Sequence, residues 1–215
     1  MEGQLGIPAQ IRELLPDVSG KHVLHLQCAT GESTAELVEL GALVTAVDLS
    51  TEALDVARER APDVAFMHAD VHELPLELHR GRFDLVFTGG GVLVWLHDLE
   101  AWAAGIASAL KPDGTLLLYD SHPVSGCLDH LGHWRDDYFD ESVFVEAGWE
   151  HFDVTGPAAT EPKHERHWRL EQVVDAVTGT GLQLTRLAEF QTLYKWIQRD
   201  RRVPWEFALL AERRE

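Results

Sequence analysis

Residues 21–50, KHVLHLQCATGESTAELVELGALVTAVDLS, constrain the fold of this chain more than any other segment. Apolar and β-branched residues over 22–27 predict a strand, and a turn of small residues then leads into an amphipathic helix that ends at Gly41. A second strand is predicted over 42–47, with Asp48 at its carboxyl end. Strand, tight turn, helix, strand and acid, in that order, form half of a nucleotide-binding crevice in a doubly wound α/β sheet.

The turn and the acid indicate what kind of ligand fits this crevice. Ser33 or Thr34 is expected to cap the helix, whose N-terminus would present free N–H groups to the ligand. Asp48 follows the turn by about twenty residues, the spacing at which a carboxylate accepts hydrogen bonds from both hydroxyls of a ribose. A dinucleotide site would need G-x-G-x-x-G for its pyrophosphate, and only Gly31 of such a pattern is present. A ligand with a ribose and no phosphate therefore fits better.

The first strand and its turn carry a resemblance to a known family. Residues 24–28 read L-H-L-Q-C, and here the chain resembles the class I S-adenosylmethionine (SAM)-dependent methyltransferases, in particular a small-molecule subgroup with this first motif. The wider family usually has an acid followed by G-x-G-x-G. His25 stands at the position of that acid, and Gln27 and Ala29 stand at two of the glycines. The resemblance covers residues 21–123 closely and the C-terminal part more loosely.

The resemblance implies that SAM is the cofactor and that loops after four strands bind it. In the family, the acid at the position of Asp48 binds the ribose, the acid at the position of Asp70 contacts the adenine amino group, and the glycines 89–91 lie beside the methyl donor. The expected cofactor-binding residues are Gln27, Cys28, Ala29, Gly31, Asp48, Leu49, Ser50, Asp70, Val71, Thr88 and Gly89.

The remaining pattern predicts a mostly parallel, seven-stranded Rossmann-like sheet with helices on both faces. Apolar spacing predicts helices over residues 51–60, 99–110 and 170–181. Strands are predicted over residues 64–67, 83–87, 115–119, 182–190 and 205–213. The sequence KPDG at 111–114 is expected to be the turn that ends a helix. The last two strands are expected to form an antiparallel hairpin, whereas a dehydrogenase would continue with parallel units.

Composition limits the classes of function. A chain of 215 residues with 45% hydrophobic side chains can bury one core, so residues 1–215 are expected to form a single domain. Its net charge of −18 repels phosphate backbones, so nucleic acid is not an expected partner. The sequence has no apolar run of ~18 residues and no signal-peptide pattern, so we expect a cytoplasmic protein without a membrane span. A monomer and a homodimer are both compatible with the sequence.

Residues 121–167 depart from helix and strand periodicity and are expected to form an insertion that covers the crevice. This segment begins at the carboxyl end of the fifth strand, the edge where open α/β sheets bind ligands. Its aromatic rings would make walls of a small-molecule pocket. Contacts with the methyl acceptor are expected from Trp134, Tyr138, Trp149 and His167.

Catalysis by methyl transfer depends mainly on in-line placement of the reacting atoms, and a general base adds what deprotonation requires. His122, after the fifth strand, is the expected base, and His97 ranks second. No metal is assigned, although His122, Cys127, His130 and His133 could hold one in a metal-assisted enzyme. A SAM-fold protein that binds or regulates without methyl transfer is a second alternative.

Overall fold

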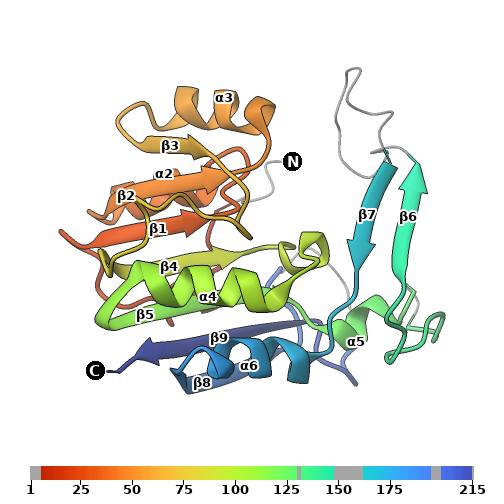
Figure 1. Cartoon of the computed structure of the whole chain (residues 1–215). Helices are drawn as coiled ribbons and strands as arrows, with labels where there is room; N and C mark the ends of the chain where they lie inside the picture. Colours follow the sequence, from red (N-terminus) through yellow and green to blue (C-terminus); the bar gives the residue numbers. More distant parts are fainter. Residues whose placement is uncertain (1–5, 130–131, 148–161, 195–199, 215) are drawn as a thin grey trace.

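The computed structural model of the chain describes residues 6–129, 132–147, 162–194 and 200–214 (Figure 1). The main sheet has seven strands: β1 (His22–Leu26), β2 (Leu43–Asp48), β3 (Ala65–His68), β4 (Phe83–Gly89), β5 (Leu110–Ser121), β8 (Leu182–Phe190) and β9 (Glu206–Arg213). Their order in the sheet is β3-β2-β1-β4-β5-β9-β8. Strands β1 to β5 are parallel, and β9 runs antiparallel to both β5 and β8. This confirms the predicted mostly parallel sheet with an antiparallel C-terminal hairpin.

Helices cover both faces of this sheet. The helices are α1 (Ala9–Arg12), α2 (Glu32–Glu39), α3 (Thr51–Arg60), α4 (Leu99–Ala109), α5 (Pro123–Gly126) and α6 (Leu170–Gly179). Buried residues of α1, α2 and α3 share one hydrophobic core, and those of α4 and α6 share the other. Strand β4 supplies both cores, since Leu85 and Phe87 point to the first and Val86 to the second. Burial on both faces is what a parallel sheet requires, and it explains the continuous apolar runs of the central strands.

The strand order reverses between β1 and β4, and this reversal positions a ligand site. The chain leaves β1 to form α2 on one face and leaves β4 to reach α4 on the other face. The two connections therefore part at the carboxyl ends of these neighbouring strands. In open α/β sheets a crevice forms at such a reversal, outside the carboxyl ends.

The segment 111–114 is an element that the sequence misassigned. It was expected to be a turn between a helix and the fifth strand, but α4 ends at Ala109 and β5 already begins at Leu110. Leu110 pairs with Phe83, and Thr115 pairs with Leu85, so the intervening residues form an irregularity within the strand. The turn chemistry is still used locally, because Asp113 has a left-handed φ of 61°.

The insertion contains regular structure that the sequence did not predict. Besides α5 it forms a small antiparallel sheet of β6 (Val143–Ala147) and β7 (Pro162–Arg166). This β6–β7 sheet stands beyond the carboxyl ends of the parallel strands (Figure 1). Strand β7 packs against η1 (Leu93–Trp95), a short 3₁₀ helix that follows β4. Among the helices of the described segments, none has the length and apolar content that crossing a bilayer requires.

Candidate functional site

The loop between β1 and α2 has the left-handed backbone conformations that glycine favours, although two of the three residues that adopt them are not glycine. Gln27 and Ala29 have φ values of 53° and 46°, and Gly31 has 81°. A left-handed conformation costs a residue with a Cβ roughly 1–2 kcal/mol. The Ala29 N–H donates to the Asp48 carboxylate at 2.7 Å, and the Cys28 N–H donates to the Val47 carbonyl at 3.0 Å. These bonds from β2 hold the loop in its strained conformation.

The side chain of Gln27 gives a reason for its place in this loop. Its Nε2 donates to the Val92 carbonyl at 3.1 Å, and its Oε1 accepts from the Thr88 hydroxyl at 3.2 Å. The amide thus links the loop after β1 to the end of β4. Thr88 is fully buried, and its expected contact with the cofactor stays a prediction. Cys28 is also buried, and burial raises the pKa of its thiol to about 12.

Asp48 is held in place by the backbone around it. Its Oδ1 accepts from the Ser50 N–H at 2.9 Å, and its Oδ2 accepts from Ala29. Each carboxylate oxygen has a further acceptor position. Ser50 also caps α3, where its hydroxyl accepts from the Ala53 N–H at 3.1 Å. Leu49 between them is 64% exposed and supplies apolar surface beside the acid.

The first turn of α2 faces the crevice without a side-chain cap, which corrects the expectation for Ser33 and Thr34. The N-cap is Gly31, which has no side chain that could cap the helix. The Thr34 hydroxyl instead bonds His25 Nδ1 at 2.7 Å. Burial lowers the pKa of His25 to about 3, so this ring is a neutral core residue at the former acid position. The uncapped N–H groups of such a helix can bind an anionic group.

Helix α3 holds the same loop from outside. The Arg60 guanidinium donates to the Thr30 carbonyl and pairs with Glu32 at 3.0 Å. A Cβ on Gly31 would come within 2.9 Å of the Ala57 Cβ, so the close packing of α3 also requires the glycine. Arg60 was missed by the sequence analysis, because an exposed helical arginine carries no sign of a contact thirty residues away.

Asp70 lies in the loop after β3 and is fixed by His72. Its Oδ1 accepts from the His72 N–H at 2.9 Å and is 2.7 Å from His72 Nδ1. Burial raises the pKa of Asp70, but the two His72 hydrogen bonds outweigh it and the net shift is downward. The His72 and His97 rings lie 4.1 Å apart. His97, the second candidate base, therefore lies next to Asp70. Val71 is buried, and its expected contact with the cofactor stays a prediction.

The three glycines at 89–91, which end β4 and follow it, are present for two different reasons. A Cβ on Gly89 would lie 2.1 Å from the Tyr119 carbonyl oxygen, and one on Gly90 would lie 3.2 Å from the Tyr119 hydroxyl. Both glycines are therefore required by the packing of Tyr119. Gly91 has a φ of 97° and has no atom within 4 Å of the position of a Cβ. The backbone at Gly91 is therefore open on its Cβ side, and its expected place beside the methyl donor stays a prediction.

Asp120 organises the chain that follows these glycines, and the sequence analysis missed it. Its carboxylate is buried and accepts from the N–H groups of Val92 at 2.8 Å, Leu93 at 2.9 Å and Ser121 at 2.6 Å. Burial raises the pKa of Asp120 even though these N–H groups act to lower it. An acid at the end of an apolar strand was the available signal.

His122 caps α5. Its Nδ1 accepts from the Val124 N–H at 3.2 Å, and its Nε2 lies 3.1 Å from Glu189 Oε1. Burial lowers the pKa of His122, and Glu189 opposes that shift. A neutral ring that donates from Nε2 and accepts at Nδ1 satisfies both contacts. The capping role is thus accounted for, while the role as general base stays a prediction.

The residues expected to bind the acceptor are spread over the insertion. Trp134 is 60% exposed. The Tyr138 hydroxyl accepts from the Leu170 N–H at 3.4 Å, at the start of α6. His167 packs on Phe144 of β6, with ring centroids 4.9 Å apart. Trp149 lies outside the described residues.

The residues of the metal alternative have other partners. Cys127 Sγ lies 3.7 Å from the Pro123 carbonyl, and His133 lies 3.4 Å from Asp129. His130 lies outside the described residues. Within the described part of the chain, no three His, Cys, Asp or Glu side chains are grouped so that they could hold a metal ion.

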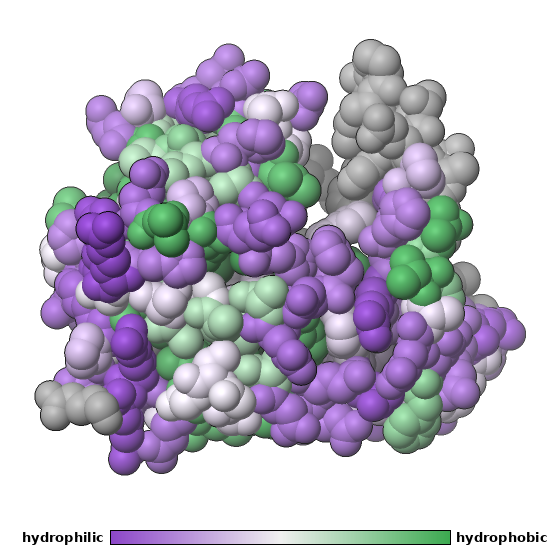
Figure 2. Space-filling view, viewed as in Figure 1, coloured by the Kyte–Doolittle hydropathy of each residue, from purple (hydrophilic) through white to green (hydrophobic). Residues whose placement is uncertain are grey.

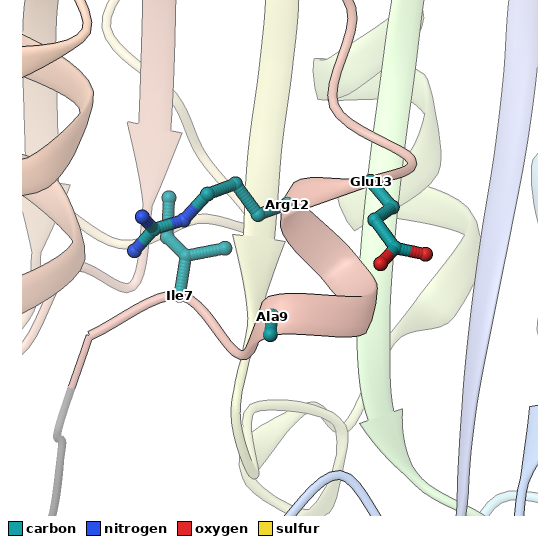
Figure 3. Close-up of a pocket in the computed structure, with 4 residues that line it drawn as sticks. All are labelled: Ile7, Ala9, Arg12 and Glu13. Atoms are coloured by element: carbon teal, nitrogen blue, oxygen red, sulfur yellow. The ribbon is translucent and has the colours of Figure 1, made fainter.

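Two hollows lie away from the carboxyl edge of β1. A groove of about 860 Å³ between α4 and α6 has His97 and Trp168 among its lining residues. A hollow of about 350 Å³ beside α1 is lined by Ile7, Ala9, Arg12 and Glu13 (Figure 3). In this second hollow the Arg12 guanidinium, which pairs with Glu36 of α2, extends over Ile7. Neither hollow includes Asp48 or Asp70.

Comparisons with known proteins agree with this geometry. The sequence model of the methyltransferase domain family matches residues 23–114, which run from β1 into β5. An uncharacterized methyltransferase from Synechocystis is 34% identical over 114 residues, 51% of this chain and 51% of that protein. The trans-aconitate 2-methyltransferase of Escherichia coli is 29% identical over 176 residues, 76% of this chain and 68% of that protein.

Among solved structures, a SAM-dependent methyltransferase from Mesorhizobium loti has the same fold. Its TM-score is 0.72 at 24% identity, over 95% of this chain and 96% of that chain. The chain spans about half the length of the first curated relatives that it matches.

Proposed function

We propose that this chain transfers a methyl group from SAM to a small-molecule acceptor. The observation that carries the proposal is the loop after β1, which takes left-handed conformations at Gln27, Ala29 and Gly31 and is bonded directly to Asp48. The strain at two non-glycine residues indicates that the site requires this backbone shape. The loop, the uncapped α2 and the acid meet at the reversal of strand order, where an adenosine ligand would bind.

The residues around this loop fit the parts of SAM. Asp48 has acceptor positions left for the ribose hydroxyls, and Leu49 offers apolar surface to the adenine base. Asp70, kept ionised by His72, can accept from the adenine amino group. The amide groups at the start of α2 suit the carboxylate of the methionyl part. Gly91, open on its Cβ side, leaves room for the reacting end.

Bound SAM would supply an activated methyl group for a lone pair of the acceptor, and the electrons of the broken carbon–sulfur bond would stay on the sulfur of S-adenosylhomocysteine. The chain must hold the acceptor in line with that bond and accept its proton where one is lost. His122 is our proposed base. This role requires the ring to release its contact with Val124 or Glu189 when the acceptor binds.

We further propose that residues 121–167 cover the site and select the acceptor. The β6–β7 sheet stands beyond the carboxyl edge, and β7 packs on η1 directly after the glycine loop. The net charge of −18 makes nucleic acid an unfavourable acceptor. The trans-aconitate 2-methyltransferase among the relatives supports a small organic acceptor.

Calorimetric titration with SAM and S-adenosylhomocysteine tests the proposal. Asp48→Ala should weaken both ligands by about 10- to 150-fold, because hydrogen bonds to a charged acceptor contribute roughly 1.5–3 kcal/mol. Asp55→Ala, which removes an exposed acid from α3, is the matched control and should leave both affinities unchanged. Unchanged SAM affinity in folded Asp48→Ala would disprove the ribose assignment. Tighter binding of NAD than of SAM to the wild type would disprove the methyltransferase proposal.

A further inference from the structure

Arg166, the last residue of β7, differs from the other half-buried arginines of the described chain. The guanidinium of Arg169 bonds Glu141 and Glu171, and that of Arg213 bonds the carbonyls of Ala107 and Leu110. In the described part of the chain, the Arg166 guanidinium has neither a carboxylate nor a carbonyl partner. Its Nε is buried and has no hydrogen-bond partner.

A buried donor without a partner is unfavourable, since it loses its hydrogen bonds to water and gains none. The chain has 36 acidic residues against 18 basic ones, so acidic partners for an arginine are abundant. The unpartnered Nε of Arg166 therefore suits a ligand that supplies acceptor atoms.

Trp168 holds the Arg166 guanidinium in a defined orientation. The guanidinium carbon lies 4.0 Å from the centroid of the indole ring. The indole is fixed in turn, because its Nε1 donates to the Leu96 carbonyl at 2.9 Å. Stacking occupies the faces of a guanidinium and leaves the N–H groups at its edge for hydrogen bonds in its plane. Nε together with a neighbouring amino group forms the fork that binds a carboxylate through two bonds.

The surroundings of Arg166 suggest what else the ligand carries. In the register of the β6–β7 sheet, Val143 lies directly opposite Arg166, and Val145 lies opposite His164. Paired positions of an antiparallel sheet share a face, so the two valines and Arg166 lie on one face. Val143 and Val145 are 50% and 59% exposed, and Figure 2 shows apolar surface on this part of the molecule. An apolar body next to a carboxylate would cover these side chains.

The position of this face connects it to the proposed methyl-transfer site. Strand β7 packs on η1, and Leu96, which anchors Trp168, follows η1 directly. Asp120 fixes the start of η1 through the N–H groups of Val92 and Leu93. Arg166 is thus joined by a short series of contacts to the end of β5 and the glycine loop after β4.

We propose that Arg166, stacked on Trp168, binds a carboxylate of the methyl acceptor, and that the acceptor is a small carboxylic acid with an apolar body. This inference rests on the proposed function and names the class of its acceptor. The guanidinium supplies the attraction locally, against a net charge that would otherwise repel an anion.

The test uses the full chain saturated with S-adenosylhomocysteine and two probe pairs, benzoate with benzamide and phenylacetate with phenylacetamide. Calorimetry should detect the carboxylates and not the amides. Arg166→Gln should weaken carboxylate binding at least tenfold, and Arg166→Lys should restore only part of it, because lysine keeps the charge without the fork. Arg186→Gln, an exposed residue of β8 with the same change of net charge, is the control and should bind like the wild type.

A direct spectroscopic measurement keeps the inference testable if Arg166→Gln does not fold. In the wild type, the ¹H–¹⁵N signal of the Arg166 Nε, assigned by its loss in Arg166→Lys, should shift with a carboxylate and not with its amide. Equal carboxylate binding by Arg166→Gln and the wild type, or an Nε signal that ignores the carboxylates, would overturn the inference. Failure of S-adenosylhomocysteine itself to bind the wild type would instead remove the proposed function.

Discussion

The two sides of the proposed site are built on different principles. On the cofactor side, backbone geometry dominates: the loop after β1 is held by bonds from Asp48 and Arg60 to main-chain atoms of Ala29 and Thr30. On the acceptor side, long side chains from distant segments meet, as when Arg166 stacks on Trp168. The cofactor side is thus fixed by bonds within the chain, whereas on the acceptor side the Arg166 Nε has no hydrogen-bond partner.

The two buried histidines illustrate the same contrast. His25, on the cofactor side, bonds a threonine hydroxyl inside the sheet and has a pKa of about 3. His122, on the acceptor side, bonds a backbone N–H and the exposed carboxylate of Glu189. Glu189 is exposed, so it can move away from His122 without opening the core. Thr34 is buried, so it cannot move away from His25 in this way. This difference is the reason why we propose the proton-transfer role for His122 and not for His25.

The largest effect is expected from His122→Asn. Asparagine is a good N-cap, so this change keeps the cap of α5 and removes the titrating group. If His122 is the base, turnover should fall by about 10²–10⁴ while SAM affinity is unchanged, because proton abstraction enters the transition state alone. The measurement is S-adenosylhomocysteine release with an acceptor found among small carboxylic acids.

His97→Asn is the matched comparison, because His97 lies beside Asp70 and not at the end of β5. A smaller loss of turnover in His97→Asn than in His122→Asn would agree with the order of the two candidates. Wild-type turnover in His122→Asn would show that His122 serves as a cap alone and would make the acceptor side purely a positioning surface.

The second prediction concerns pH and the cofactor side. Unfolding exposes His25 and returns its pKa to the ordinary 6.5, so below that pH the unfolded chain binds a proton that the folded chain refuses. Stability should therefore fall as the pH drops from 6.5 toward 3, by up to about 1.4 kcal/mol per pH unit from this residue. Urea unfolding at pH 7, 6 and 5 measures the slope.

His25→Gln should remove this part of the slope, since the amide can still bond Thr34 and does not titrate. The control is His164→Gln, an exposed residue of β7, which should keep the wild-type slope. Identical slopes in wild type and His25→Gln would mean that His25 is protonated in the folded chain, and the rigid description of the cofactor side would be wrong.

The cofactor side was also the part that the sequence could predict. The order of strands and helices, the place of Asp48 and the bounds of α3 and β8 follow from apolar periodicity and turn residues, which act over short distances. The roles of Gln27 and Arg60 could not be read in this way. Each depends on a partner about thirty or more residues away, and their side chains have no local signature.

The acceptor side escaped prediction for a related reason. Strands β6 and β7 have five residues each and, in the described part of the chain, pair only with one another, so their pattern is too short to stand out. The aromatic residues Trp134 and Tyr138 were expected to line a pocket from composition alone. Their observed partners reflect chain topology, and composition carries no information about it.

The smallest expected effect is that of Ala29→Gly, which tests whether the loop after β1 is strained at Ala29. Glycine takes a φ of 46° without the steric cost of a Cβ, but it loses more backbone entropy on folding. The difference should stabilise the protein by up to about 1 kcal/mol in urea unfolding, with SAM affinity unchanged.

Ala104→Gly, at an exposed position of α4, is the matched control and should destabilise by roughly 0.5–1 kcal/mol. If Ala29→Gly raises the free energy of unfolding and Ala104→Gly lowers it, the loop is strained at Ala29. Destabilisation by both would mean that Ala29 is relaxed in the folded chain, and that the glycine-type shape of the loop costs it nothing.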